Sequence, residues 1–142
     1  MAEPRRFTLD TSAVIAYFTE EPGSDEVERL LAQAGRGRIR VFASFMTYME
    51  VLYRFWRRHG ERAGKGAYLR LKALPIHHVE VSEELLLGAS RIKALHDLSV
   101  ADAWIAATAS LTRSRLVHRD PEFRTLRSAI SLLELPAKVS RT

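Results

Sequence analysis

The chain has 142 residues, of which 46% are hydrophobic, a net charge of +5 and no cysteine. This size predicts a single domain over residues 1–142, and the lack of cysteine excludes disulfides and thiolate metal sites. No apolar run approaches the roughly 20 residues that cross a bilayer, and the N-terminus has no long apolar segment of the signal-peptide kind, so we expect a cytoplasmic protein without membrane contact.

Short apolar runs alternate with amphipathic stretches along the chain. From the N-terminus, the pattern predicts a strand at 7–9, helices at 14–18 and 24–35, a strand at 39–43, and helices at 44–56 and 61–74. It then predicts a strand at 76–81, helices at 82–96 and 99–112, and strands at 115–118 and 130–133. Strands separated by helices need crossover connections, so we expect an α/β fold with a mostly parallel sheet covered on both faces.

Four acidic residues have positions that suggest chemistry. Asp10 directly follows the first predicted strand, and Asp120 follows the strand 115–118 after one intervening residue. In parallel sheets, sites lie beyond the carboxyl ends of the strands. Glu50 and Asp102 lie instead within predicted helices that are apolar on almost every side, TYMEVLY and VADAWIAATA. Burying an ionised carboxylate is costly unless a positive charge accompanies it.

Each acid also has an ordinary explanation. Asp10 fits a helix N-cap, Asp102 fits a capping box, Asp120 before a proline fits a turn, and Glu50 could pair with Arg54 one helical turn away. All four can nevertheless converge on one end of one sheet, where they would need a shared counter-charge. A hard divalent cation that prefers oxygen ligands, Mg²⁺ or Mn²⁺, would supply it, and the corresponding chemistry is phosphodiester hydrolysis.

Four segments carry a family resemblance. LDTSAVIAYF, TYMEVLYR, LSVADAWIAATA and LVHRDPEF, between about Phe7 and Phe123, resemble the PIN-domain nucleases, specifically the VapC-type toxins of prokaryotic toxin–antitoxin pairs. The resemblance implies a PIN-like three-layer α/β/α fold with a central, mostly parallel sheet of about five strands. It also implies a Mg²⁺- or Mn²⁺-dependent endoribonuclease with an RNA substrate, a cognate antitoxin and a homodimeric assembly.

The resemblance also assigns roles to residues of this chain. The catalytic and metal-binding residues would be Asp10, Glu50, Asp102 and Asp120, and a hydroxyl of Thr11 or Ser12 would help to order the site.

One position departs from the pattern of the family. The fourth motif usually has Thr or Ser where this chain has His118, which we interpret as a strand-end histidine; the alternative is a contact with a phosphate or a metal-bound water. We interpret Glu122 as an exposed turn acid rather than a peripheral ligand.

The arginines suggest a rim that grips RNA, although a compositional bias would also explain their number. The hypothesis is that several basic residues lie at the same edge of the sheet as Asp120, while others extend the helix of Glu50. The candidates for RNA contact are Arg113, Arg115, Arg119 and His118, and those on the helix are Arg54, Arg57 and Arg58.

Two alternatives come from other functional classes. A haloacid-dehalogenase-type phosphatase would have a second acid two residues after the aspartate that follows the first strand, where this chain has Ser12. That alternative also leaves Glu50 and Asp102 unexplained. The other alternative is a non-catalytic module of the same fold that binds RNA or protein.

Overall fold

Five parallel strands form one sheet in a computed structural model that describes residues 5–137. Both ends of the predicted single domain, 1–4 and 138–142, lie outside the described residues. The strand order is β3–β2–β1–β4–β5. The strands are β1 (Arg5–Leu9), β2 (Ile39–Ser44), β3 (His77–Val79), β4 (Arg115–His118) and β5 (Leu132–Glu134).

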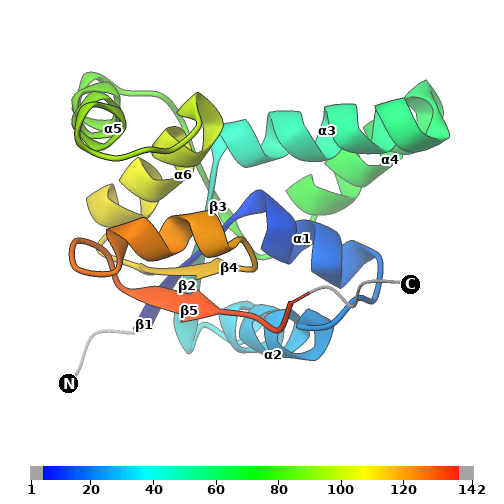
Figure 1. The fold of residues 1–142 in the computed structure, drawn as a ribbon. Helices are drawn as coiled ribbons and strands as arrows, with labels where there is room; N and C mark the ends of the chain where they lie inside the picture. Colours follow the sequence, from blue (N-terminus) through cyan, green and yellow to red (C-terminus); the bar gives the residue numbers. More distant parts are fainter. Residues whose placement is uncertain (1–4, 138–142) are drawn as a thin grey trace.

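Helices cover both faces of this sheet. They are α1 (Thr11–Phe18), α2 (Ser24–Gly35), α3 (Phe45–His59), α4 (Glu61–Lys72), α5 (Glu83–Leu95), α6 (Val100–Leu111) and the short 3₁₀ helix η1 (Pro121–Leu126). Figure 1 shows α2 on one side of the sheet and α5 and α6 on the other. The predicted α/β/α fold with a parallel sheet of about five strands is confirmed. No helix in the range 5–137 has the length and apolar character needed to cross a membrane.

Neighbouring side chains along the strands belong to two different apolar clusters. Val117 packs with Leu9, Val27 and other residues from α1, α2 and α3, whereas its neighbour Leu116 packs with Ile105 and other residues of α6 and η1. Successive strand residues point to opposite faces, so the two clusters lie on opposite sides of the sheet. The core therefore holds the strand ends rigidly on both faces.

Helices α3 and α4 pack closely because of one glycine. A Cβ atom at Gly64 would lie 2.6 Å from the carbonyl oxygen of Leu52 and 2.7 Å from Cβ of Trp56. Only a residue without a side chain permits this approach of the two helices. Gly66, two residues later on α4, has nothing within 4 Å of the same position and therefore faces open space.

Four of the predicted strands differ in extent from the observed ones: the strand predicted at 7–9 begins at Arg5, and the strand predicted at 39–43 ends at Ser44. The predicted strand 76–81 is only His77–Val79, because its partner β2 ends at Ser44, which pairs with Val79. The predicted strand 130–133 begins later, at Leu132. The amide of Ile130 donates to the carbonyl of Leu126 instead, so this residue still belongs to the turn that follows η1.

Candidate metal centre

The order of the strands creates a crevice between β1 and β4. The chain runs from β1 outward through β2 to β3, and then returns to the other side of β1 to form β4 and β5. The connections that leave β1 and β4 therefore diverge, and such a switch point is where ligands bind in open parallel sheets. Asp10 and Asp120 follow these two strands. The amide of Asp10 donates to the carbonyl of Val117 at 3.0 Å, which fixes the two strand ends together.

Asp10 caps α1 and is also buried. Its Oδ1 accepts from the amide of Ala13 at 2.8 Å, so the N-cap interpretation is correct. The hydroxyl of Ser12 lies 2.7 Å from Oδ1 and 2.9 Å from Oδ2 of Asp10, and accepts from the amide of Arg119. Ser12 therefore links the Asp10 carboxylate to the chain beyond β4.

The environment of Asp10 disfavours its charge. The side chain is only 3% exposed, and no basic side chain of residues 5–137 forms an ion pair with it. Burial raises its pKa from 3.8 to about 7, the hydrogen bonds from Ser12 and Ala13 oppose this rise, and the charges of Asp102 and Asp120 add to it. A carboxylate in such a place needs a cation from outside the chain if it is to be ionised at neutral pH.

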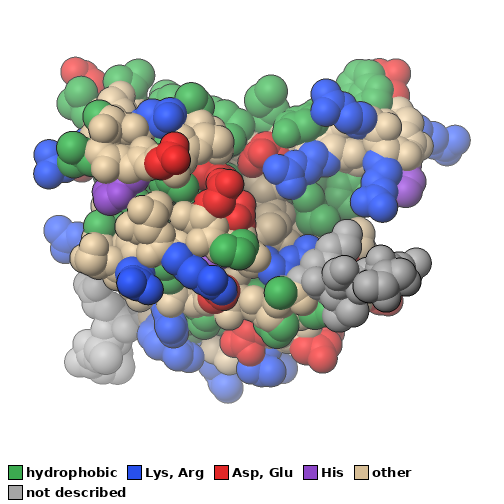
Figure 2. Space-filling view, in the orientation of Figure 1, with side chains coloured by type: hydrophobic (Ala, Val, Ile, Leu, Met, Phe, Trp, Pro, Cys, Tyr) green, Lys and Arg blue, Asp and Glu red, His purple; other side chains and the backbone are tan. Residues whose placement is uncertain are grey.

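Asp102, Asp120 and Glu122 form the open side of the same site. Oxygens of these three carboxylates lie within 4.8 Å of one another. Asp102 is in the first turn of α6, where its amide donates to the N-cap Ser99. Burial, followed by the charge of Asp120, raises the pKa of Asp102 to about 6. We call Asp10, Asp102, Asp120 and Glu122 the carboxylate cluster. Figure 2 shows acidic side chains gathered near the middle of one face, between α5–α6 and α3–α4.

Glu50 borders the carboxylate cluster but has partners of its own. Its side chain is buried, with Oε1 accepting from the Thr11 hydroxyl at 2.7 Å and Oε2 accepting from Nη2 of Arg54 at 3.0 Å. The pairing with Arg54 that helical spacing suggested is therefore present. Glu50 still contributes to the raised pKa of Asp102 through its charge. The two adjacent hydroxyls thus have different acids, Thr11 with Glu50 and Ser12 with Asp10.

The sequence matches a family model over most of its length. A model described as the PIN domain matches residues 7–140. The chain belongs to the PIN-domain family. No protein among curated sequences matches it.

Solved structures share the fold of this PIN domain. The VapBC2 structure from Rickettsia felis, bound to a DNA fragment from the promoter, has a TM-score of 0.75 at 13% identity and covers 92% of this chain and 99% of its own. DNA-bound VapBC from Salmonella typhimurium has a TM-score of 0.74 at 17% identity, covering 92% and 98%. The Mycobacterium tuberculosis VapC20 structure, described as a sarcin–ricin loop cleaving toxin, has a TM-score of 0.66 at 18% identity, covering 92% and 99%.

The expected position in the basic rim is wrong for Arg113 and Arg115. Arg115 is the first residue of β4 and Arg113 precedes it, so both lie at the amino ends of the strands, whereas Asp120 follows the carboxyl end. Arg119 is near the cluster in sequence, but its guanidinium turns away and pairs with Glu21 at 3.5 Å. On the face with the acidic centre, basic side chains lie over α3 and α4 and also below the acidic side chains, near η1 and β5 (Figure 2).

His118 and Glu122 differ from each other in accessibility. His118 is fully buried, its ring packs edge-to-face on Phe123, and burial lowers its pKa. The interpretation as a strand-end histidine fits this burial, and the side chain has no exposed surface for RNA in this structure. Glu122 is exposed, as expected of a turn acid, yet it belongs to the carboxylate cluster. The sequence feature that could have identified Glu122 is its position two residues after Asp120, at the start of η1, because this tight turn brings both acids together.

Proposed function

We propose that this PIN domain is a Mg²⁺- or Mn²⁺-dependent endoribonuclease whose active site is the carboxylate cluster with Glu50 beside it. The observation that carries the proposal is the buried carboxylate of Asp10, which has no basic partner in the described part of the chain and lies beside the charges of Asp102 and Asp120. Structural acids usually have partners, as Glu50 does here. Acids left without one at a sheet switch point fit a cation-binding role.

The residues of the proposed active site would have different roles. Asp10, Asp102 and Asp120 would hold the ion, with Glu122 at the open side. A bound divalent ion activates water and stabilises negative charge on a phosphoryl oxygen. Ser12 fixes the orientation of the Asp10 carboxylate by its hydrogen bond, and Thr11 does the same for Glu50. The basic side chains over α3 and α4 would contact the RNA phosphates beside the cleaved bond.

We also propose that the protein is the toxin of a toxin–antitoxin pair, acting as a homodimer in the cytoplasm and neutralised by a cognate antitoxin. The fold shared with VapC structures supports this proposal. Family membership leaves the phosphatase alternative without support. The experiment must therefore distinguish an endoribonuclease from a non-catalytic module on the same fold.

The decisive experiment compares RNA cleavage by wild type, Asp10→Asn and Asp102→Asn in Mg²⁺, in Mn²⁺ and in EDTA. Asp25→Asn is the matched control, because Asp25 is an exposed aspartate in the first turn of α2 on the far side of the sheet. We expect cleavage that depends on the ion, a loss of about 100-fold or more in both site variants, and no loss in the control.

Two results would contradict the proposal. Cleavage that persists in EDTA would show that the reaction does not need a metal ion. Equal cleavage by Asp10→Asn and wild type would show that the carboxylate cluster is not the active site. Binding of RNA without cleavage in any ion would favour the non-catalytic module.

A further inference from the structure

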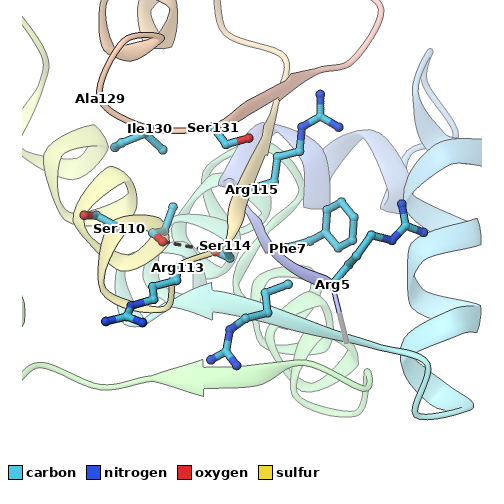
Figure 3. Close-up of a pocket in the computed structure, with 11 residues that line it drawn as sticks. Arg5, Phe7, Ser110, Arg113, Ser114, Arg115, Ala129, Ile130 and Ser131 are labelled. Carbon is cyan, nitrogen blue, oxygen red and sulfur yellow. Dashed lines mark hydrogen bonds between the residues drawn. The ribbon is translucent and has the colours of Figure 1, made fainter. Parts of the chain in front are cut away.

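A second charged site lies at the opposite end of the sheet from the carboxylate cluster. A pocket of about 450 Å³ opens where β1 and β4 begin and α6 ends (Figure 3). Four arginines line it, and none of the described residues in its lining is acidic. We call it the arginine pocket, and its arginines are Arg5, Arg6, Arg113 and Arg115.

Contacts with neutral groups hold two of these side chains in place. Nε of Arg6 donates to the carbonyl of Thr112 at 2.7 Å, and its guanidinium lies 5.0 Å from the centre of the Phe42 ring. Nε of Arg115 donates to the carbonyl of Leu132 at 3.0 Å. Neither guanidinium forms an ion pair within residues 5–137. These arginines are therefore oriented by the fold while their charge stays uncompensated.

The other two arginines stand at the mouth of the pocket. The guanidinium of Arg5 lies 5.6 Å from the centre of the Phe7 ring, and Arg113 follows α6 in a left-handed conformation with φ of 51°. Both are exposed, as are the lining hydroxyls of Ser110 and Ser131. Figure 3 shows Arg5 beside Phe7 on one side of the pocket and Arg113 with Ser110 on the other, with their guanidinium groups directed to different sides.

This combination of groups suits a phosphodiester. Each guanidinium presents a planar fork of donors that matches phosphate oxygens, and serine hydroxyls are common phosphate donors. Arginines without acidic neighbours among the described lining residues give the pocket a net positive charge, which attracts an anion. Among the described residues, the basic side chains that line the pocket are arginines and not lysines, which favours a geometric fit to phosphate over diffuse attraction.

We propose that the arginine pocket binds a backbone phosphate of the RNA substrate at a distance from the cleaved bond. The proposal rests on the proposed function in taking RNA as the partner. Strand β4, whose four residues span about 10 Å, lies between the pocket and the carboxylate cluster, and helices cover both faces of the sheet. An RNA that occupies both sites must therefore extend along the edge of the molecule, so the protein distinguishes a long or folded RNA from a short oligonucleotide.

The test measures RNA binding separately from cleavage. Fluorescence anisotropy in EDTA compares wild type, the double variant Arg113→Ala/Arg115→Ala and the single variant Arg5→Ala, with a long folded RNA and with a short oligonucleotide, over a range of salt concentrations. The control is Arg91→Ala/Lys93→Ala, which removes the same charge from exposed positions of α5. Circular dichroism melting verifies that each variant is folded.

We expect the double variant to bind the long RNA about tenfold more weakly, and the slope of log affinity against log salt to fall by about 0.7, as for one lost phosphate contact with a single-stranded segment. Arg5→Ala should show a smaller loss in the same direction.

An affinity for long RNA that falls no further than in the α5 control would overturn the proposal. So would unchanged RNA affinity together with lost binding of polyglutamate, since that result assigns the pocket to an acidic protein partner. If wild type cleaves no RNA in any ion, the proposed function fails, but the comparison in EDTA still decides whether the pocket binds RNA.

Discussion

The buried carboxylate of Asp10 should make the unfolding free energy of the metal-free protein depend strongly on pH. Its pKa is raised to about 7, mainly by burial, whereas a free aspartate has a pKa of 3.8. The folded protein therefore holds this proton more tightly than the unfolded chain. The stability linked to Asp10 is present at low pH and is lost as the pH rises from about 4 to about 7. Above that range, the metal-free fold contains a buried, unpaired negative charge.

Asp10→Asn removes this charge and keeps the shape of the side chain. The amide oxygen can still accept from the backbone of Ala13, so the cap of α1 is preserved. The gap between the two pKa values corresponds to about 4 kcal/mol of unfolding free energy at pH 8 and about 2 kcal/mol at pH 5. These figures are upper limits for the stabilisation of Asp10→Asn relative to wild type in EDTA.

The assay is equilibrium denaturation in urea with EDTA, followed by the fluorescence of the two tryptophans, at pH 5 and at pH 8. Saturating Mg²⁺ should reverse the order of stability at pH 8, because wild type gains the free energy of ion binding and the variant does not. Asp25→Asn should change stability by less than about 0.5 kcal/mol at either pH. A wild type at least as stable as Asp10→Asn at pH 8 in EDTA would refute the reasoning.

Other predictions concern helix packing, the Glu50 pair and the open side of the cluster. Gly64→Ala should destabilise the fold by about 1 to 3 kcal/mol, because the new methyl group meets the backbone of α3. Gly66→Ala, in open space, should stabilise it by up to about 1 kcal/mol. Thermal melts of both variants check this. Arg54→Ala should cost about 1 to 3 kcal/mol at pH 7 in urea denaturation, since Glu50 then stays buried without its cation. Glu122→Gln should weaken Mg²⁺ binding in calorimetry while leaving the melting temperature in EDTA equal or higher.

The sequence predicts the position of an acid in this site best when the acid follows a strand, because the direction of a parallel strand fixes the edge of the sheet at which it ends. Asp10 and Asp120 follow strands of a parallel sheet, and carboxyl ends of neighbouring parallel strands necessarily meet. Asp102 stands out because its helix is apolar almost all round. The same rule of direction would have placed Arg115 correctly, because the first residue of a parallel strand lies at the opposite edge from the residue after its end.

The rest depends on side-chain geometry that a linear pattern does not contain. Spacing allows both an ion pair and a metal contact for Glu50, and only the folded chain shows that Thr11 and Arg54 each take one of its oxygens. The turn that brings Glu122 beside Asp120 is a 3₁₀ helix too short to leave a periodic signal. The guanidinium of Arg119 lies against Glu21 and the carbonyl of Pro22, which are about a hundred positions away in the chain.

On the proposed function, two binding events would be coupled, because acids and arginines that lack ion-pair partners among residues 5–137 lie at opposite ends of one sheet. An RNA strand that approaches the acidic end meets repulsion until a cation is present, while the basic end attracts it at any time. Thermodynamic reciprocity then requires that RNA held near the acids tighten the cation by the same factor by which the cation tightens RNA. Metal affinities measured on the isolated protein should therefore underestimate those of the protein engaged with its substrate.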